Sequence, residues 1–202
     1  MSKYFAFVSL TLLALVLMAC SKPPHRPVVM METTQGNIEI EVYIDKAPIS
    51  GGDFLTYVDN KFYNDQGFYR VVRPDNDPLE MGMSLIQGGR LDSEPLTDPI
   101  AHELTTETGL SNKEGVVSIA RLEPGSGSAA YFFINIGNND FLDYGGKRNP
   151  DGQGYATFGK VVKGMDVIRK IQALEAQGLS GDNVTTGQIL TKPVKIIQAY
   201  RM

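Results

Sequence analysis

Two segments, Phe68-Tyr69-Arg70-Val71-Val72 and Leu85-Ile86-Gln87-Gly88-Gly89, decide how the rest of this chain is organised. The first is a run of β-branched and aromatic residues, and such runs are typical of strands. Side chains alternate across a strand, so Arg70 is expected to share one face with Phe68 and Val72.

The second segment has the same alternation, which places Leu85 and Gln87 on one face. If the two strands pair antiparallel, the Arg70 guanidinium and the Gln87 carboxamide meet on a mainly apolar surface. The alternative is that Arg70 is an ordinary outward residue in contact with solvent, as most strand arginines are. The two segments alone leave both interpretations open.

Length and composition limit the possible classes of function. The chain has 202 residues, which suits one domain with a sizeable core, and its apolar and charged fractions are ordinary for a globular protein. A net charge of −4 and the lack of a basic stripe argue against a nucleic-acid partner. Cys20 is the single cysteine, which excludes an internal disulfide, and neither His25 nor His102 has a neighbour at metal-ligand spacing.

The N-terminal segment has the pattern of an export signal. Tyr4–Ala19 follows a short positive start and is apolar except for one serine and one threonine, a length typical of a secretory core region and short for a membrane span. Its end, Leu17-Met18-Ala19-Cys20, resembles the bacterial lipobox, in which the cysteine is lipidated after cleavage. We expect a lipoprotein signal peptide over residues 1–19, then a lipidated cysteine and a proline-rich tether over residues 20–27. A buried N-terminal helix is disfavoured, because no polar face is patterned.

Hydrophobic periodicity predicts antiparallel strands with two helices. Strands are expected at 28–33, 38–44, 68–72, 85–89, 115–120, 131–136, 155–162 and 194–200. One helix is expected to begin near Pro48, with Ser50 and Asp53 spaced like a capping box, and an amphipathic helix to run over Met165–Ala176. This pattern favours a closed barrel with helices at its ends over an open sheet with an exposed edge.

Short motifs follow one another along the segment from Val28 to Tyr200. They are Ala47-Pro48, Asp53-Phe54, Phe62-Tyr63, Phe68-x-Arg70-Val71, Ile86–Gly89, Ser118–Arg121, Phe132–Asn135, Phe141–Asp143 and Phe158–Asp166. In this order they resemble the cyclophilin-type peptidyl-prolyl cis-trans isomerases, most closely the bacterial periplasmic members. The resemblance implies a mainly β domain over residues 28–202, an eight-stranded antiparallel closed β-barrel capped by two α-helices.

The same resemblance implies the residues of the site. Carried over by position, the catalytic arginine falls on Arg70 and the catalytic glutamine on Gln87. The proline-binding pocket falls on Leu85, Ala120, Phe133, Phe141, Leu142 and Tyr155. Alternation within residues 131–136 puts Phe133 on the face opposite to Phe132, which favours a pocket over a core position for Phe133.

The chain departs from the family pattern at several of these positions. Phe141 stands where many members have tryptophan, while Tyr155 and Tyr69 stand where they have histidine. The family joins its arginine strand to the glutamine strand by a short turn that ends in a pocket phenylalanine. Here the connection is the longer Arg73–Ser84 insert, and Ser84 occupies the phenylalanine position.

The lost phenylalanine forms much of the proline-binding wall in the family. Leu79, Met81 or Met83 could fold in to replace it, because methionine adapts well to irregular gaps. The insert leaves the fold assignment unchanged and affects the expected efficiency.

Rotation about an X–Pro amide breaks no covalent bond and needs no nucleophile, metal or cofactor. Two functions are therefore compared. The first is an isomerase that assists the folding of exported proteins, held at the outer membrane by Cys20 and facing the periplasm, since Ser21 after the cysteine is typical of outer-membrane sorting. The second is a proline-peptide binding or scaffold module with little turnover. In both, we expect a monomer whose partners are proline-containing peptides and unfolded exported proteins, without nucleic acid.

Overall fold

The computed structural model describes residues 26–91, 94–177 and 185–202, so the expected signal peptide and Cys20 lie outside the described residues. The elements are β1 (Val28–Thr33), β2 (Gly36–Val42), α1 (Pro48–Asp59), β3 (Gly67–Val72), β4 (Leu85–Gly89), α2 (Thr105–Thr108), β5 (Val116–Ile119), β6 (Tyr131–Asn135), the 3₁₀ turn η1 (Asp140–Leu142), β7 (Thr157–Lys163), α3 (Met165–Gln172) and β8 (Ile189–Arg201). In this part of the chain no helix is long and apolar enough to cross a membrane.

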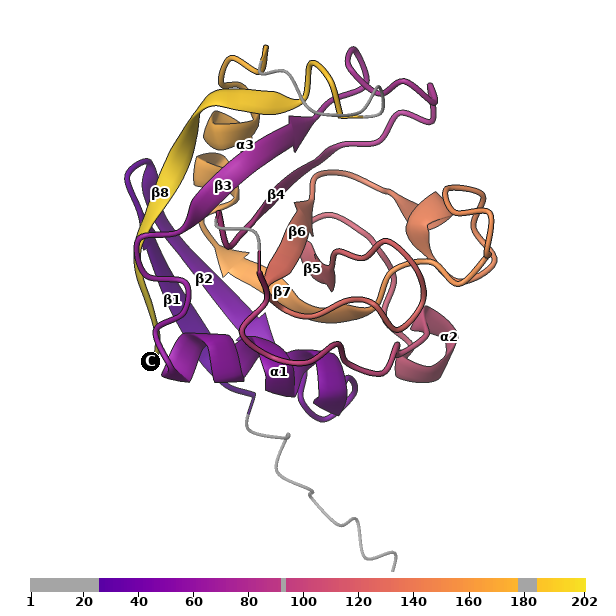
Figure 1. The fold of residues 1–202 in the computed structure, drawn as a ribbon, viewed down its shortest axis with the longest axis horizontal. Helices are drawn as coiled ribbons and strands as arrows, with labels where there is room; N and C mark the ends of the chain where they lie inside the picture. Colours follow the sequence, from indigo (N-terminus) through magenta and orange to yellow (C-terminus); the bar gives the residue numbers. More distant parts are fainter. Residues whose placement is uncertain (1–25, 92–93, 178–184) are drawn as a thin grey trace, which may run out of the picture.

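The eight strands of the described residues close into an antiparallel barrel in the order β1-β2-β7-β5-β6-β4-β3-β8, and β8 pairs with β1 (Figure 1). Closure gives each strand a partner on both sides and removes exposed sheet edges. α1 packs against β7 and β8, whereas α3 packs against β2, β3 and β4 at the other end of the barrel. The predicted barrel with two capping helices is confirmed. The four-residue α2 adds a third helix, too short to give a periodic signal.

Aromatic side chains fill the barrel interior. Phe54 of α1 meets Phe132 of β6 edge to face, with ring centroids 5.7 Å apart and planes at 83°. Phe68 of β3 meets the same ring at 5.8 Å and 83°. Edge-to-face geometry of this kind is favoured by the quadrupoles of the rings. A second group of buried side chains, the outer cluster, consists of Val72, Met83, Leu85, Phe133 and Leu142.

Strand alternation assigns residues to these two groups as predicted. On β6, Phe132 is fully buried in the barrel core, whereas Phe133 belongs to the outer cluster. On β4, Ile86 belongs to the core and Leu85 to the outer cluster. The wall formed by β4 and β6 therefore carries apolar side chains on both faces, and those on the outer face form a poorly solvated surface outside the core.

β3 contains a β-bulge that the alternation of residues in the sequence does not reveal. The pairing register of β3 with β4 shifts by one between Phe68 and Arg70, so Tyr69 is an extra residue on this strand. The register with β8 also shifts there, but on that side the extra residues lie on β8. A bulge re-aims the side chains that follow it. Phe68 therefore packs in the barrel core, while Val72 lies in the outer cluster. The expectation that Arg70 shares a face with Phe68 is wrong, because simple alternation does not cross a bulge.

The N-terminus of α1 is capped by a distant side chain. The Glu103 carboxylate accepts hydrogen bonds from the backbone N–H groups of Ile49 at 3.1 Å and Ser50 at 2.7 Å. A negative charge is favourable at this end of a helix. The predicted capping box of Ser50 and Asp53 is wrong, because α1 makes no side-chain cap bond of its own and Asp53 accepts the N–H of Ala129 at 2.7 Å.

Several element boundaries also differ from the prediction, most by one or two residues and two by more. α3 ends as a regular helix at Gln172 rather than at Ala176. β8 begins at Ile189 rather than Val194, because its first part pairs with β3 and its second part with β1. Pro193 lies within the part that pairs with β3, and a proline inside a run weakens the sequence signal for a strand.

Candidate active site

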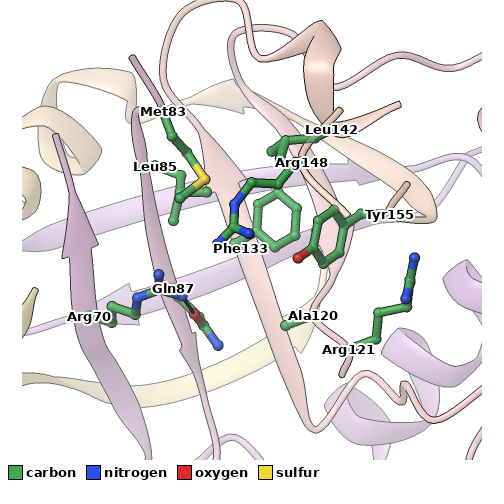
Figure 2. Close-up of a pocket in the computed structure, with 10 residues that line it drawn as sticks. All are labelled: Arg70, Met83, Leu85, Gln87, Ala120, Arg121, Phe133, Leu142, Arg148 and Tyr155. Carbon is green, nitrogen blue, oxygen red and sulfur yellow. Dashed lines mark hydrogen bonds between the residues drawn. The ribbon is translucent and has the colours of Figure 1, made fainter. Parts of the chain in front are cut away.

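A pocket of about 70 Å³ opens on the outer face of the barrel wall (Figure 2). Its lining residues are Arg70, Met83, Leu85, Gln87, Ala120, Arg121, Phe133, Leu142, Arg148 and Tyr155. The structure thus brings together the predicted site residues from the strands β3, β4 and β6, the η1 turn and the loops that hold Ala120 and Tyr155, with one exception. Phe141 does not line the pocket and instead packs against the outer cluster.

Two glutamine side chains hold the Arg70 guanidinium. Its Nη1 donates to Oε1 of Gln87 at 2.8 Å, while its Nε and Nη2 donate to Oε1 of Gln188 at 2.8 and 2.6 Å. Gln188 is fully buried, and its own Nε2 donates to the backbone carbonyl of Asn76 at 2.7 Å. Because the guanidinium is planar, these bonds fix its orientation before any substrate binds.

The bulge residue Tyr69 orients the amide of Gln87. The Nε2 of Gln87 donates to the Tyr69 hydroxyl at 2.8 Å, which turns Oε1 toward Arg70. Burial raises the pKa of Tyr69 to about 12. Tyr69 is therefore a neutral hydroxyl throughout the physiological pH range.

The Arg73–Ser84 insert is organised around the buried carboxylate of Asp77. This carboxylate accepts hydrogen bonds from the backbone N–H groups of Leu79 at 3.3 Å, Met81 at 3.0 Å and Met83 at 3.1 Å. Asp77 is only 6% exposed, so these charge-assisted bonds form in a poorly solvated place. They give the insert a defined path that ends at the pocket.

Met83 forms the pocket wall for which the sequence offered three candidates. It is buried in the outer cluster and lines the pocket, whereas Leu79 is 49% exposed. Ser84 does not line the pocket, because its hydroxyl accepts a 2.8 Å hydrogen bond from Nε2 of Gln172 on α3. The apolar wall is thus supplied one residue earlier in the chain than in the family pattern.

The two glycines after Gln87 allow β4 to lie close to its neighbours. A Cβ on Gly88 would lie 2.5 Å from a ring carbon of Phe68, and one on Gly89 would lie 2.0 Å from the carbonyl oxygen of Ala130. Gly89 also has φ +127°, which side chains strongly disfavour. Both positions therefore require glycine for Gln87 to keep its place beside Arg70.

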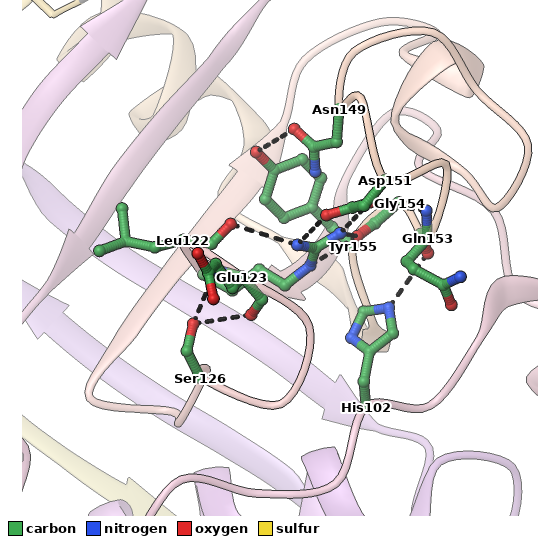
Figure 3. Close-up of polar contacts among 10 residues, drawn as sticks. His102, Leu122, Glu123, Ser126, Asn149, Asp151, Gln153, Gly154 and Tyr155 are labelled. Carbon is green, nitrogen blue, oxygen red and sulfur yellow. Dashed lines mark hydrogen bonds and ion pairs between the residues drawn. The ribbon is translucent and has the colours of Figure 1, made fainter.

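Arg121 connects the pocket rim to the loop at residues 145–154, in which its partners Asp151 and Gly154 lie (Figure 3). Its Nη1 and Nη2 donate to the two carboxylate oxygens of Asp151 at 2.8 and 3.0 Å, and its Nε and Nη2 donate to the carbonyl of Gly154 at 2.9 and 2.6 Å. Hydrogen bonding to Arg121 holds the pKa of Asp151 below its usual range. This bidentate pair braces the loop against the barrel.

A second hollow of about 320 Å³ adjoins the pocket and shares Ala120 and Arg121 with it. Its other lining residues are Tyr69, Leu122, Ser126 and Tyr131. The Leu122 side chain is 92% exposed. Because the two concavities share these residues, a peptide bound in the pocket can continue into the second hollow.

Arg121, Arg148 and Gln188 belong to the site and were not predicted. Arg121 ends one of the quoted motifs, so its position was available from the sequence. Gln188 lies 118 residues from Arg70 in the chain, and no local pattern marks it. Arg148 lies in a turn-rich segment that carries no periodic signal.

The lining of the pocket limits its chemistry. None of the described residues that line it is Ser, Thr, Cys, His, Asp or Glu, so it presents neither a nucleophile with a base nor an acid–base group that titrates near neutrality. In the described part of the chain no group of three or more His, Cys, Asp and Glu could hold a metal ion. What remains is an oriented cation beside an apolar cavity, which suits an uncharged polar group such as an amide.

Comparisons with known proteins agree with this geometry. The chain is 41% identical over 145 residues to a peptidyl-prolyl cis-trans isomerase of Acinetobacter baylyi, covering 71% of this chain and 70% of that protein. It is 35% identical over 175 residues to peptidyl-prolyl cis-trans isomerase A of Dickeya dadantii, covering 84% of each. It is 36% identical over 157 residues to peptidyl-prolyl cis-trans isomerase B of Escherichia coli, covering 76% of this chain and 88% of that protein.

A solved structure shares the fold, and a family model matches most of the chain. A crystal structure of a cyclophilin-type peptidyl-prolyl cis-trans isomerase from Cryptosporidium parvum superposes with a TM-score of 0.61 at 17% identity, covering 88% of this chain and 98% of the other. The family model described as cyclophilin type peptidyl-prolyl cis-trans isomerase/CLD matches residues 28–201. On these grounds the chain belongs to the family of cyclophilin-type peptidyl-prolyl cis-trans isomerases.

Proposed function

We propose that this isomerase acts on X–Pro bonds of exported proteins at the bacterial envelope, and that Arg70 lowers the barrier to rotation. The observation that carries the mechanism is the position of the Arg70 guanidinium, which Gln87 and Gln188 hold at the edge of the apolar pocket. No cofactor is needed, because the reaction only twists an amide.

The catalytic step follows from the electronic structure of the amide. Rotation costs roughly 18–20 kcal/mol because it removes the resonance between nitrogen and carbonyl. In the twisted transition state the proline nitrogen regains a lone pair, and a charged N–H donor of Arg70 binds that lone pair better than it binds the planar ground state. An interaction that strengthens only at the transition state raises the rate rather than the affinity.

The apolar wall provides the second contribution. Met83, Leu85, Phe133 and Leu142 are each buried and line the pocket, where they can enclose a proline ring. A poorly solvated pocket strengthens the interaction between the guanidinium and the nitrogen. The Nε2 of Gln87 uses one N–H for Tyr69, and its second N–H can hold a substrate carbonyl.

The binding-module alternative rested on the insert and on Ser84. Met83 now supplies a buried wall at this place, and the Asp77 carboxylate ties the insert down by three backbone bonds. These contacts replace the missing wall that motivated the alternative. The oriented Arg70 favours turnover over mere binding, because a module that only binds proline has no need of a transition-state donor.

The envelope part of the proposal rests on the N-terminal sequence. The apolar run of Tyr4–Ala19, the lipobox-like end at Cys20 and the following prolines support export, lipidation and an outer-membrane tether. The tether reaches the barrel near Arg26, whose Nε lies 2.8 Å from a carboxylate oxygen of Asp45. The proposed partners are proline-containing peptides and unfolded exported proteins, bound by a monomer.

A direct test is the isomerisation of a proline tetrapeptide by the purified protein in a protease-coupled assay. The proposal predicts that the protein accelerates the cis-to-trans step in proportion to its concentration. Measurable binding of the peptide without acceleration would establish the binding module instead.

A further inference from the structure

We propose that Arg148 makes this site selective for peptides that carry a carboxylate on a residue close to the proline. The inference rests on the proposed function and adds a substrate class to it. It comes from the surroundings of one arginine in the pocket that the isomerisation mechanism does not use.

Arg148 lies in the loop at residues 145–154 and lines the same pocket as Phe133 and Leu142. Its backbone N–H donates to the carbonyl of Phe141 at 3.3 Å, which attaches the base of its side chain to the pocket rim. Figure 2 shows the Arg148 side chain beside the Phe133 ring, on the side where Met83 and Leu85 lie. A group bound beside that ring therefore lies within reach of the guanidinium.

The guanidinium of Arg148 lacks a protein partner within the described residues. Its Nε is buried and has no hydrogen-bond acceptor there. A buried donor on a charged group costs free energy when it is left unpaired, and such groups are rare in folded proteins. An acceptor supplied by a ligand would remove this cost on binding.

Arg121 lines the same pocket, but its guanidinium, unlike that of Arg148, has hydrogen-bond acceptors among the described residues. It has a bidentate carboxylate partner in Asp151 and a carbonyl partner in Gly154. None of the described residues that line the pocket is Asp or Glu, so no lining carboxylate can pair with Arg148. The pocket is thus electropositive on the side where Arg148 lies.

The loop presents Arg148 in a defined position. Gly145 donates its N–H to the carbonyl of Gly152 at 2.7 Å, and Gly152 donates to the carbonyl of Asn149 at 3.0 Å. The Tyr155 hydroxyl donates to Oδ1 of Asn149 at 3.2 Å. The backbone of the loop is therefore held in place before a ligand binds, and only the Arg148 side chain remains to be ordered.

A carboxylate is the group that fits best. The Nε and one Nη of an arginine form a planar fork that matches both oxygens of a carboxylate, and phosphate or sulfate is not a normal component of an unfolded polypeptide. The proline ring occupies the outer-cluster side of a pocket of only about 70 Å³, so the acidic side chain must belong to a nearby residue. The inferred substrate is therefore a segment with Glu or Asp flanking the proline.

The test compares matched peptides that differ only in charge. Glutamate or its neutral isostere glutamine is placed at each of the two positions before and the two positions after a single proline. Dissociation constants are measured by calorimetry at low and high salt, and isomerisation is measured by NMR exchange for wild type, Arg148→Gln, Arg148→Lys and Lys147→Gln. Lys147 is the matched control, because it is exposed in the same loop, does not line the pocket and carries the same charge.

For wild type we expect the glutamate peptide to bind roughly three- to thirtyfold tighter than the glutamine peptide at one or more positions, and less so at high salt. Arg148→Gln should bring this ratio to about one, Arg148→Lys should retain part of it, and Lys147→Gln should retain it fully. A ratio near one in wild type at every position overturns the inference, as does a ratio that survives Arg148→Gln. Isomerisation of the glutamine peptides by wild type would then leave the proposed function standing, whereas no isomerisation of any peptide would remove both.

Discussion

Arg70 and Gln87 occupy the same rung of the β3–β4 ladder, and Nη1 of Arg70 donates to Oε1 of Gln87 at 2.8 Å. The Tyr69 bulge produces this relationship. Phe68 pairs with Gly88, so an unbroken ladder would place Arg70 opposite Ile86, which points into the barrel core. Because of the extra residue, the Arg70 side chain points away from the barrel core and toward the pocket. Bulges often redirect side chains in this way beside active sites.

Gln188 should act as a positioning residue for Arg70. Its Oε1 accepts from both Nε and Nη2, so Gln188→Leu removes the acceptor that fixes the guanidinium plane. We expect kcat/KM to fall about tenfold while the peptide dissociation constant changes less than about twofold. Both are measured in one isomerase assay with a parallel binding titration.

Two further variants separate positioning from a general loss of structure. Gln188→Glu keeps an acceptor for Arg70 and should recover most of the turnover, whereas Gln198→Leu changes an exposed glutamine on β8 and should have no effect. Equal losses in Gln188→Leu and Gln188→Glu would assign the effect to the lost bond with the Asn76 carbonyl instead.

Met83→Ala should weaken peptide binding and turnover by the same factor. Met83 is buried in the outer cluster and touches the proposed ring site in ground state and transition state alike. We expect a roughly three- to tenfold rise in the dissociation constant and an equal fall in kcat/KM. Met81→Ala, on the same insert but only partly buried and outside the pocket lining, is the control. An unchanged affinity in Met83→Ala would mean that another residue forms the wall.

Turnover should be nearly flat between about pH 6 and 8. Burial raises the pKa of Tyr69 to about 12, so this hydroxyl stays neutral over the range. His25 lies outside the described residues, and His102 contacts the carbonyl of Gln153 at 3.1 Å rather than the pocket (Figure 3). A bell-shaped profile of kcat/KM against pH would indicate a general acid or base and would contradict the mechanism.

The local parts of this structure could be predicted from the sequence. Alternation placed Leu85 and Phe133 outside the barrel and Phe132 inside it, because a two-residue period depends only on neighbouring residues. The closed barrel followed from the number and pattern of strands. Arg70 and Gln87 were predicted to meet, and they do.

The non-local parts could not be predicted. The Tyr69 bulge leaves composition unchanged and is visible only as a register shift between paired strands. Glu103 caps α1 from 53 residues away, so the nearby Ser50 and Asp53 gave a misleading local signal. Met83 was one of three candidates until the Asp77 bonds were seen to set the path of the insert.

Cys20 should hold the protein at the membrane. Cys20→Ser removes the thiol that we propose accepts the lipid, so this variant should appear in the soluble fraction or remain unprocessed, whereas wild type should sediment with membranes. Cell fractionation followed by detergent extraction checks this. Ser21→Ala is a neighbouring control that keeps the thiol, and membrane association of Cys20→Ser equal to wild type would refute lipidation at this residue.

The central claim is that Arg70 stabilises the twisted amide rather than the bound ground state. Its most direct test is to measure kcat/KM and the peptide dissociation constant for wild type, Arg70→Ala and Arg70→Lys in the same buffer. We expect Arg70→Ala to lower kcat/KM roughly thirty- to a thousandfold, equivalent to about 2–4 kcal/mol, with a change in affinity below about threefold. Arg70→Lys should restore little, because a point charge lacks the planar fork. Wild-type turnover in Arg70→Ala, or a loss of affinity as large as the loss of turnover, would contradict it.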